Sequence, residues 1–228
     1  MFRRKELQES LLRELADLPA KLGFEFKPRE QGFRAFRPGG CVFFHLSFVP
    51  HPADFDVIAD VALRLDAVED LLNEERPYLS KGEKKLTWTI GGCELGQLSG
   101  GMQRRWTIVS EADIKETAAS ISAAFESIGV HFIEQYSDLP TLLAVLSRND
   151  KLARLVSPSH SGRCKAALAI AYVLGRYDEI EGLIAQSEAY LSSLNFLNSK
   201  KEFDDFRQFA VKIRHLTESK NPGKVSGG

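Results

Sequence analysis

The residues that could do chemistry together gather between positions 45 and 60. His45 lies in an apolar run, and Asp54, Asp56 and Asp60 follow at alternating positions. A histidine beside a carboxylate can act as an acid–base pair, and neighbouring carboxylates can bind a cation. No second carboxylate cluster or glycine-turned calcium loop supports these chemistries. The aspartates therefore indicate the solvated face of a strand. We expect His45 to be a hydrogen-bonded histidine in the core or in a groove.

The histidines and cysteines lack the spacing of metal ligands. No two of the five histidines are four residues apart, and neither H-E-x-x-H nor C-x-x-C occurs. The cysteines are Cys41, Cys93 and Cys164, an odd number at wide spacing, which predicts reduced thiols in a cytoplasmic protein. Cys93 follows two glycines and could be an exposed nucleophile, but no local histidine would activate it. We expect no metal, no cofactor and no catalytic residue among them.

Residues 98–105, Leu-Ser-Gly-Gly-Met-Gln-Arg-Arg, resemble the signature loop of ATP-binding-cassette ATPases. That loop presents backbone N–H groups to a phosphate at the start of a helix. The chain has no G-x-x-x-x-G-K-[ST] and no apolar strand that ends in Asp-Glu. Residues 106–109 then read as a strand and not as a helix. The string therefore predicts a flexible hairpin loop between two strands.

Composition limits the classes of partner. Apolar residues make up 43% of the 228-residue chain and charged residues 27%, with a net charge of −1. A soluble globular protein has these proportions. The near-zero charge gives no field that would attract nucleic acid or an anionic membrane. No signal peptide and no run of 18 apolar residues occurs, so we expect no membrane span and a cytoplasmic location.

Hydropathy patterns place strands in the first half and helices in the second. An amphipathic helix is predicted at 5–22, where leucines recur at spacings of three and four, and a short one at 67–75. Period-two alternation predicts strands, and apolar stripes that begin at Ser110 predict helices. The strands are predicted at 32–37, 41–49, 55–63, 86–90 and 105–109. The helices are predicted at 110–129, 138–147, 162–174, 177–193 and 200–217.

These segments predict an α+β fold. It has an antiparallel sheet of about five strands in residues 1–110, and the helical residues 111–217 pack on one face of it as one continuous domain. The composition of residues 218–228 predicts a disordered tail. The helical hairpin at 162–193 is similar to one unit of a tetratricopeptide array, but a single unit does not make a solenoid.

The binding surface that we predict holds Arg34, Arg37 and His45. The two arginines alternate with Phe33 and Phe36. Basic residues among aromatics can bind single-stranded nucleic acid, but four residues on a near-neutral chain indicate ordinary strand alternation. Exposed polar groups beside aromatics suit protein interfaces. We therefore expect another protein as the partner, and neither nucleic acid nor membrane.

Several segments resemble a family of bacterial domains of unknown function. They are LGFEFK at 22–27, GFRAFR at 32–37, FFHLS at 43–47, RWTI at 105–108 and VHFIEQY at 130–136. The resemblance covers about residues 8–190, and the chain departs from it at His45, where such sequences usually carry glutamine. It implies an α+β sheet followed by helices, and some members lie in toxin–immunity loci. The family has no established catalytic residues, so none is carried over.

Three functions follow as hypotheses. The first is a non-enzymatic protein that binds another protein, such as an immunity protein that blocks a toxin or an accessory factor. The second is an enzyme with a small-molecule groove across the sheet, which needs His45 to converge with Asp54 or Asp56. The third is a scaffold that docks a partner on the hairpin at 162–193, which needs an exposed apolar patch there.

Overall fold

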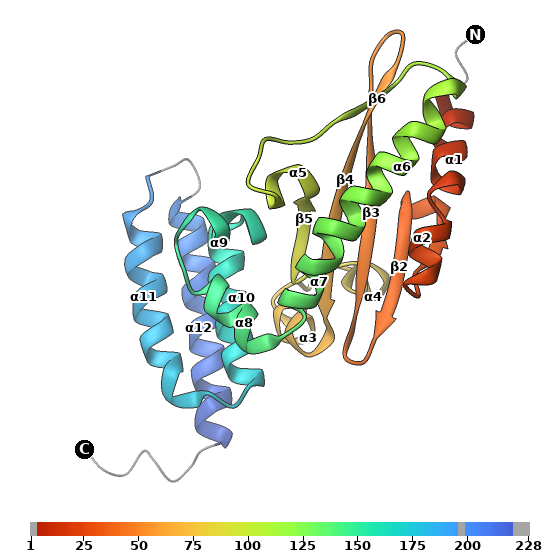
Figure 1. Ribbon diagram of the computed structural model, residues 1–228. Helices are drawn as coiled ribbons and strands as arrows, with labels where there is room; N and C mark the ends of the chain where they lie inside the picture. The colour runs from red at the N-terminus through yellow and green to blue at the C-terminus, as the bar shows by residue number, and fades with distance from the viewer. Residues whose placement is uncertain (1–3, 196–198, 221–228) are drawn as a thin grey trace. The chain divides into compact units, whose positions relative to one another are not determined.

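The computed structural model describes residues 4–195 and 199–220 (Figure 1). The chain divides into two compact units. The first, the sheet unit, comprises residues 1–65 and 90–137; the second, the helical unit, comprises residues 66–89 and 138–228. This division differs from the predicted boundary at residue 110. Residues 111–137 belong with the sheet, and residues 66–89, which separate two strands in the sequence, belong with the helices.

The sheet has six strands and is antiparallel throughout, as the α+β prediction requires. Its order is β1-β2-β3-β4-β5, and β6 also pairs with β4. Because β3 takes one edge of β4 over its whole length, β5 and β6 lie one after the other along the opposite edge. The strands are β1 (Glu25–Lys27), β2 (Gly32–Arg37), β3 (Gly40–Pro50), β4 (Phe55–Leu65), β5 (Ile90–Glu94) and β6 (Trp106–Ile108).

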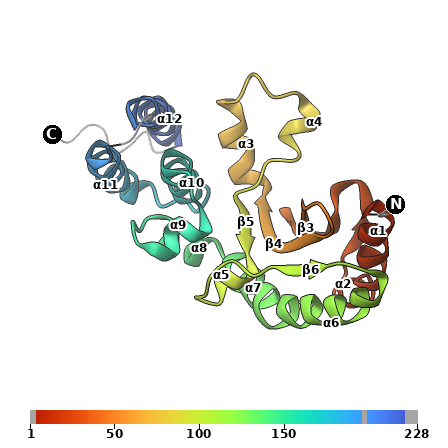
Figure 2. The same ribbon diagram turned by 90° about the horizontal axis from the view of Figure 1, so that it is seen from above.

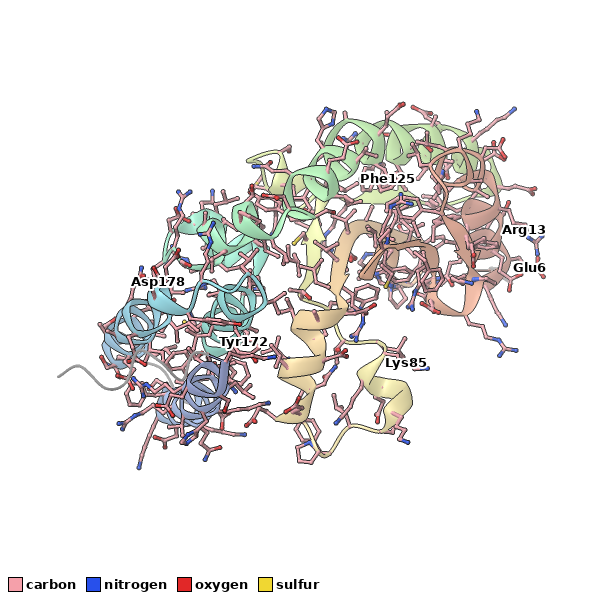
Figure 3. All side chains as sticks on the ribbon, turned by 90° about the horizontal axis from the view of Figure 1, so that it is seen from below. Glu6, Arg13, Lys85, Phe125, Tyr172 and Asp178 are labelled. Atoms are coloured by element: carbon pink, nitrogen blue, oxygen red, sulfur yellow. The ribbon has the colours of Figure 1, made fainter. Side chains whose placement is uncertain are left out.

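One face of this sheet is covered by helices of the same unit. Figure 1 shows α6 running across the strands with α1 beside it. Between helix and sheet lies a buried aromatic cluster, in which Phe125 stacks on Phe44 and meets Phe24 edge-on; Figure 3 labels Phe125. The helical segments of the unit are α1 (Arg4–Glu14), α2 (Asp17–Lys21), η1 (Pro28–Glu30), α5 (Leu95–Leu98), η2 (Glu111–Asp113), α6 (Ile114–Ala124), η3 (Phe125–Val130) and α7 (His131–Tyr136).

Two helices of the sheet unit differ from the prediction: one is divided and the other is longer. The helix predicted at 5–22 is divided into α1 and α2, because Pro19 cannot donate to the carbonyl of Leu15 and its ring clashes with that carbonyl. The helix predicted to stop at Gly129 continues through the π-helical η3 to Tyr136. Gly129 lies inside η3 and does not take the left-handed conformation that ends a helix. Its missing side chain leaves room for a neighbouring ring, since a Cβ there would lie 2.7 Å from the Phe125 ring.

The helical unit is built around α10. This helix contacts α3, α8, α11 and α12, and most of its side chains are buried. Figure 2 shows α10, α11 and α12 grouped side by side. The segments of the unit are α3 (Asp66–Glu74), α4 (Lys81–Lys84), α8 (Leu139–Leu146), α9 (Lys151–Val156), α10 (His160–Val173), η4 (Tyr177–Glu179), α11 (Ile180–Ser193) and α12 (Ser199–Lys220).

Two predictions for the C-terminal region concern the tail at 218–228 and the hairpin at 162–193. The predicted tail begins too early, because Glu218 to Lys220 form the last turn of α12; its remainder, 221–228, lies outside the described residues. Within the described residues of the hairpin at 162–193, no large apolar side chain is exposed. Half-buried apolar side chains remain at the end of α10, at Tyr172, Val173 and Leu174, so the scaffold role stays a prediction.

Candidate functional site

The three residues of the predicted binding surface lie on two faces of the sheet. Successive strand residues point to opposite faces, so Arg34 and Arg37 lie on opposite faces of β2. His45 pairs with Gly32 and shares the face of Arg34. On that face, the Phe43 ring lies 5.6 Å from the His45 ring and 5.4 Å from the Arg34 guanidinium carbon. The structure thus brings Arg34 and His45 together and leaves Arg37 apart.

Both arginines contact other parts of the same unit. Arg34 forms an ion pair with Glu30 on η1. Arg37 donates a hydrogen bond of 3.2 Å to the carbonyl oxygen of Leu22, and its guanidinium lies over the Phe24 ring at 5.9 Å. These contacts give each arginine a structural role within the fold. A role in binding a partner stays a prediction for both.

His45 is paired with Asp60 and not with either of the two aspartates that the enzyme hypothesis requires. Its Nδ1 lies 3.0 Å from Oδ2 of Asp60, its direct neighbour on β4. Asp56 lies four residues further along the strand, about 13 Å away, where its Oδ2 is 3.2 Å from Nε2 of His51. The proposed convergence of His45 with Asp54 or Asp56 is wrong, because the antiparallel register sets His45 opposite Asp60.

Asp56 links β4 to β6. It accepts hydrogen bonds from the Thr107 hydroxyl at 2.7 Å and from Arg105 at 3.4 Å. The hydrogen bond from Thr107, more than those from His51 and Arg105, lowers the pKa of the Asp56 carboxyl against the opposing effect of burial. An ionised carboxylate with satisfied partners fits a polar strand face. In the part of the chain that the structure describes, no group of three or more His, Cys, Asp or Glu could hold a metal ion.

The string that resembles an ATPase signature belongs to a loop built around a buried carboxylate. Glu94 ends β5, and its Oε1 accepts from the backbone N–H groups of Gly96 at 2.8 Å and Arg104 at 3.1 Å. Its Oε2 accepts from the N–H of Gln97 at 2.9 Å. The N–H groups at the start of α5 are therefore occupied by the chain's own carboxylate. The predicted hairpin loop is wrong, because β5 and β6 both pair with β4 and not with each other.

Cys93 is a buried cysteine that forms no disulfide, and it lies on β5. Burial, with a smaller contribution from the charge of Asp60, raises the pKa of its thiol to about 12. An ordinary thiol ionises near pH 8.5, and only the thiolate alkylates readily. We expect Cys93 to resist iodoacetamide at neutral and mildly alkaline pH while the protein is folded, and to react once urea unfolds it. Peptide mass spectrometry would measure this, and rapid labelling of Cys93 in native buffer would contradict it.

A groove in the sheet unit lies between α1 and the edge of the sheet. Its volume is about 460 Å³. Part of its lining is apolar: Leu12 is buried, Pro28 is exposed, and Phe26 stacks on Phe33 at 5.3 Å while leaving 36% of its surface exposed. The groove borders β1, which among the described strands pairs with β2 alone. The lining residues are Lys5, Glu9, Leu12, Arg13, Phe26, Pro28 and Arg29.

The charges around this groove are mainly positive. Lys5, Arg13 and Arg29 face one carboxylate, Glu9, which lies 3.7 Å from Arg13 in an ion pair along α1. Figure 3 shows Arg13 projecting outward from its helix. Lys5 and Arg29 form no ion pair with any described residue. Lys5, Glu9 and Arg13 recur at the four-residue spacing that marks one helix face, but nothing in the sequence links that face to Phe26 and Arg29.

A second, more polar pocket lies within the helical unit. Its volume is about 400 Å³, and it is formed by α3 and the segment after it, the start of α10 and the first half of α12. Three cationic and two anionic side chains line it together with hydroxyl and amide groups. The lining residues are Leu72, Glu75, Arg76, Tyr78, Ser159, Ser161, Gly162, Lys165, Lys201, Asp205 and Gln208.

Comparison with known proteins finds no relative of this chain: no family model, no curated protein and no solved structure matches it. Among the described residues, no helix has both the length and the apolar character needed to cross a membrane.

Proposed function

We propose that this protein acts without catalysis by binding another protein, and that it holds an acidic, extended segment of that partner in the groove between α1 and β1. The observation that carries the proposal is the combination of an apolar lining with three cationic side chains and one carboxylate. Counting these side chains gives the lining a formal charge of +2, from three positive and one negative. A chain with a net charge of −1 thus concentrates positive charge at this place.

The position of the groove favours an extended partner. An edge strand offers unpaired backbone groups, and such edges recruit peptides as an added strand. Phe26 on β1 is exposed over 36% of its surface and stacks on Phe33, its cross-strand neighbour on β2. Aromatic side chains that are held in place serve as interface anchors. The expected ligand therefore combines acidic residues with an apolar or aromatic side chain that packs on Phe26.

The family resemblance narrows the kind of partner that we propose. Some of the similar bacterial domains lie in toxin–immunity loci, so a toxin with an acidic exposed segment is the partner class it suggests. Cys41, Cys93 and Cys164 are buried and form no disulfide, which suits a reducing compartment. We accordingly place this binding role in the cytoplasm, as an immunity or accessory factor.

The test uses synthetic peptides and charge reversal in the groove. A labelled peptide of alternating glutamate and phenylalanine should bind the full-length protein, and the same peptide with lysine in place of glutamate should not. The Lys5→Glu/Arg29→Glu double variant should bind the acidic peptide at least about tenfold more weakly, because two attractive contacts become repulsive. Fluorescence anisotropy at low and moderate salt would measure both affinities.

The matched control changes the same charge elsewhere in the sheet unit. Lys115 is exposed on α6 and does not line the groove, so Lys115→Glu should leave peptide affinity within about twofold, since distant exposed charges are screened by salt. A Phe26→Ala variant should weaken binding without changing its salt dependence. Equal affinity of the double variant and of Lys115→Glu for the acidic peptide would overturn the proposal.

A further inference from the structure

The polar pocket of the helical unit contains cations that the fold leaves without ion partners. Arg76 donates to Glu69 at 3.1 Å and is thereby engaged. Lys165, half-buried on α10, and Lys201, exposed on α12, form no hydrogen bond or ion pair with any described residue. Lys165 holds its charge partly shielded from water, and Lys201 lines the same pocket from α12. Two ammonium groups without carboxylate partners on one pocket suit a ligand that carries negative charge.

The carboxylates of the pocket do not neutralise these lysines. Glu75 lies 3.4 Å from Lys212, which it pairs with instead. Asp205 attracts Lys165 electrostatically, but the two are beyond the distance of an ion pair. Burial is the largest influence on Lys165 and lowers the pKa of its ammonium group, against the opposing charges of Asp205 and Glu75. The ammonium group of Lys165 therefore lacks a close counterion in the unliganded pocket.

The start of α10 does not provide the site by itself. Its first N–H groups are already taken, since Ser161 donates to Glu202 at 2.8 Å and Gly162 donates to the Ser159 hydroxyl at 3.1 Å. An anion would be held by the lysine side chains and not by these amides. The hydroxyl and carboxylate groups on the rim, from Ser159 and Asp205, are suited to hydrogen-bond a polar, uncharged part of the same ligand.

We infer that this pocket binds a small phosphorylated polyol, with its phosphate between Lys165 and Lys201 and its hydroxyl groups toward Asp205. The volume of about 400 Å³ lies within the range of small-molecule sites, about 300–1,000 Å³. The mixture of unpaired cations and one free carboxylate selects a ligand that has both an anionic group and hydrogen-bond donors. This second site is independent of the groove between α1 and β1.

The test is calorimetric titration of the full-length protein with glycerol 3-phosphate, inorganic phosphate and glycerol. Glycerol 3-phosphate should bind more tightly than inorganic phosphate, and glycerol should not bind. Lys201→Met and Lys165→Met should each weaken glycerol 3-phosphate binding by about tenfold or more, because each removes a charge-assisted contact. Asp205→Asn should weaken glycerol 3-phosphate more than it weakens inorganic phosphate.

The control is the neighbouring lysine. Lys200 is exposed and does not line the pocket, so Lys200→Met should leave the affinity for glycerol 3-phosphate unchanged. Lys201 is also exposed, and its replacement is expected to leave the fold intact; it therefore keeps the test valid if Lys165→Met unfolds the unit. The inference fails if glycerol 3-phosphate does not bind, or if Lys201→Met and Lys200→Met bind it equally well. Neither lysine variant should alter acidic-peptide binding in the sheet unit.

Discussion

Replacing Phe125 with alanine should destabilise the sheet unit by about 3–5 kcal/mol, the cost of deleting a buried phenyl ring. Phe125 has no exposed surface. Its ring stacks on Phe44 with 4.0 Å between centroids and 14° between planes, and it meets Phe24 edge-on at 5.6 Å. The substitution therefore removes two aromatic pairs along with the buried area. Domains are stable by only about 5–15 kcal/mol, so this loss is a large fraction of the total.

The measurement is urea unfolding followed by tryptophan fluorescence. The chain has two tryptophans, Trp106 in the sheet unit and Trp88 in the helical unit. A Trp88→Phe background isolates the signal of Trp106. The control is Phe36→Ala on β2, where the ring is 62% exposed and the same deletion should cost less than about 1 kcal/mol. Similar losses for the two alanine variants would show that Phe125 is not central to the packing.

The strands and helices that could be predicted are those whose hydropathy pattern matches the faces that they bury in the structure. β3 and β4 are eleven residues long, and β4 alternates buried and half-buried residues from Phe55 to Val61; the residues after Ser110 repeat with a helical period. The strand predicted at 86–90 lies four residues before β5, because β5, Ile-Gly-Gly-Cys-Glu, contains two glycines, which have low strand propensity. Its hydrogen bonds to β4 decide the outcome, and the sequence does not show them.

The candidate sites show a similar limit. Alternation correctly placed His45 and Arg34 on sheet faces, but the pairing of His45 with Asp60 depends on register, which long-range packing sets. The groove between α1 and β1 combines Lys5 with Arg29, 24 positions apart, and the polar pocket combines residues from 72 to 208. Local spacing identifies the residues of one element that share a face. It does not identify which elements meet.

Glu94 provides the second large effect, because three backbone donors depend on one buried carboxylate. The side chain is 4% exposed and accepts from Gly96, Gln97 and Arg104. Glu94→Ala leaves all three N–H groups without this acceptor, at about 1–3 kcal/mol for each one that water does not reach. We expect a total loss of at least about 3 kcal/mol. The bond to Arg104 also closes the loop that returns the chain to β4, so the pairing of β6 should weaken as well.

The conservative variant distinguishes hydrogen bonding from charge. Glu94→Gln keeps the shape of the side chain. Its amide nitrogen cannot accept a hydrogen bond, however, so at least one backbone N–H loses its acceptor, which should lower the free energy of unfolding by about 1–3 kcal/mol. Glu134→Gln makes the same charge change at an exposed residue of α7 and should stay within about 0.5 kcal/mol of the parent. In urea unfolding followed by Trp106 fluorescence, the loss in free energy of unfolding should be largest for Glu94→Ala, smaller for Glu94→Gln and smallest for Glu134→Gln. Amide hydrogen exchange should accelerate at Gly96, Gln97 and Arg104 in both Glu94 variants. Unchanged exchange at these three amides would mean that the carboxylate does not organise the loop.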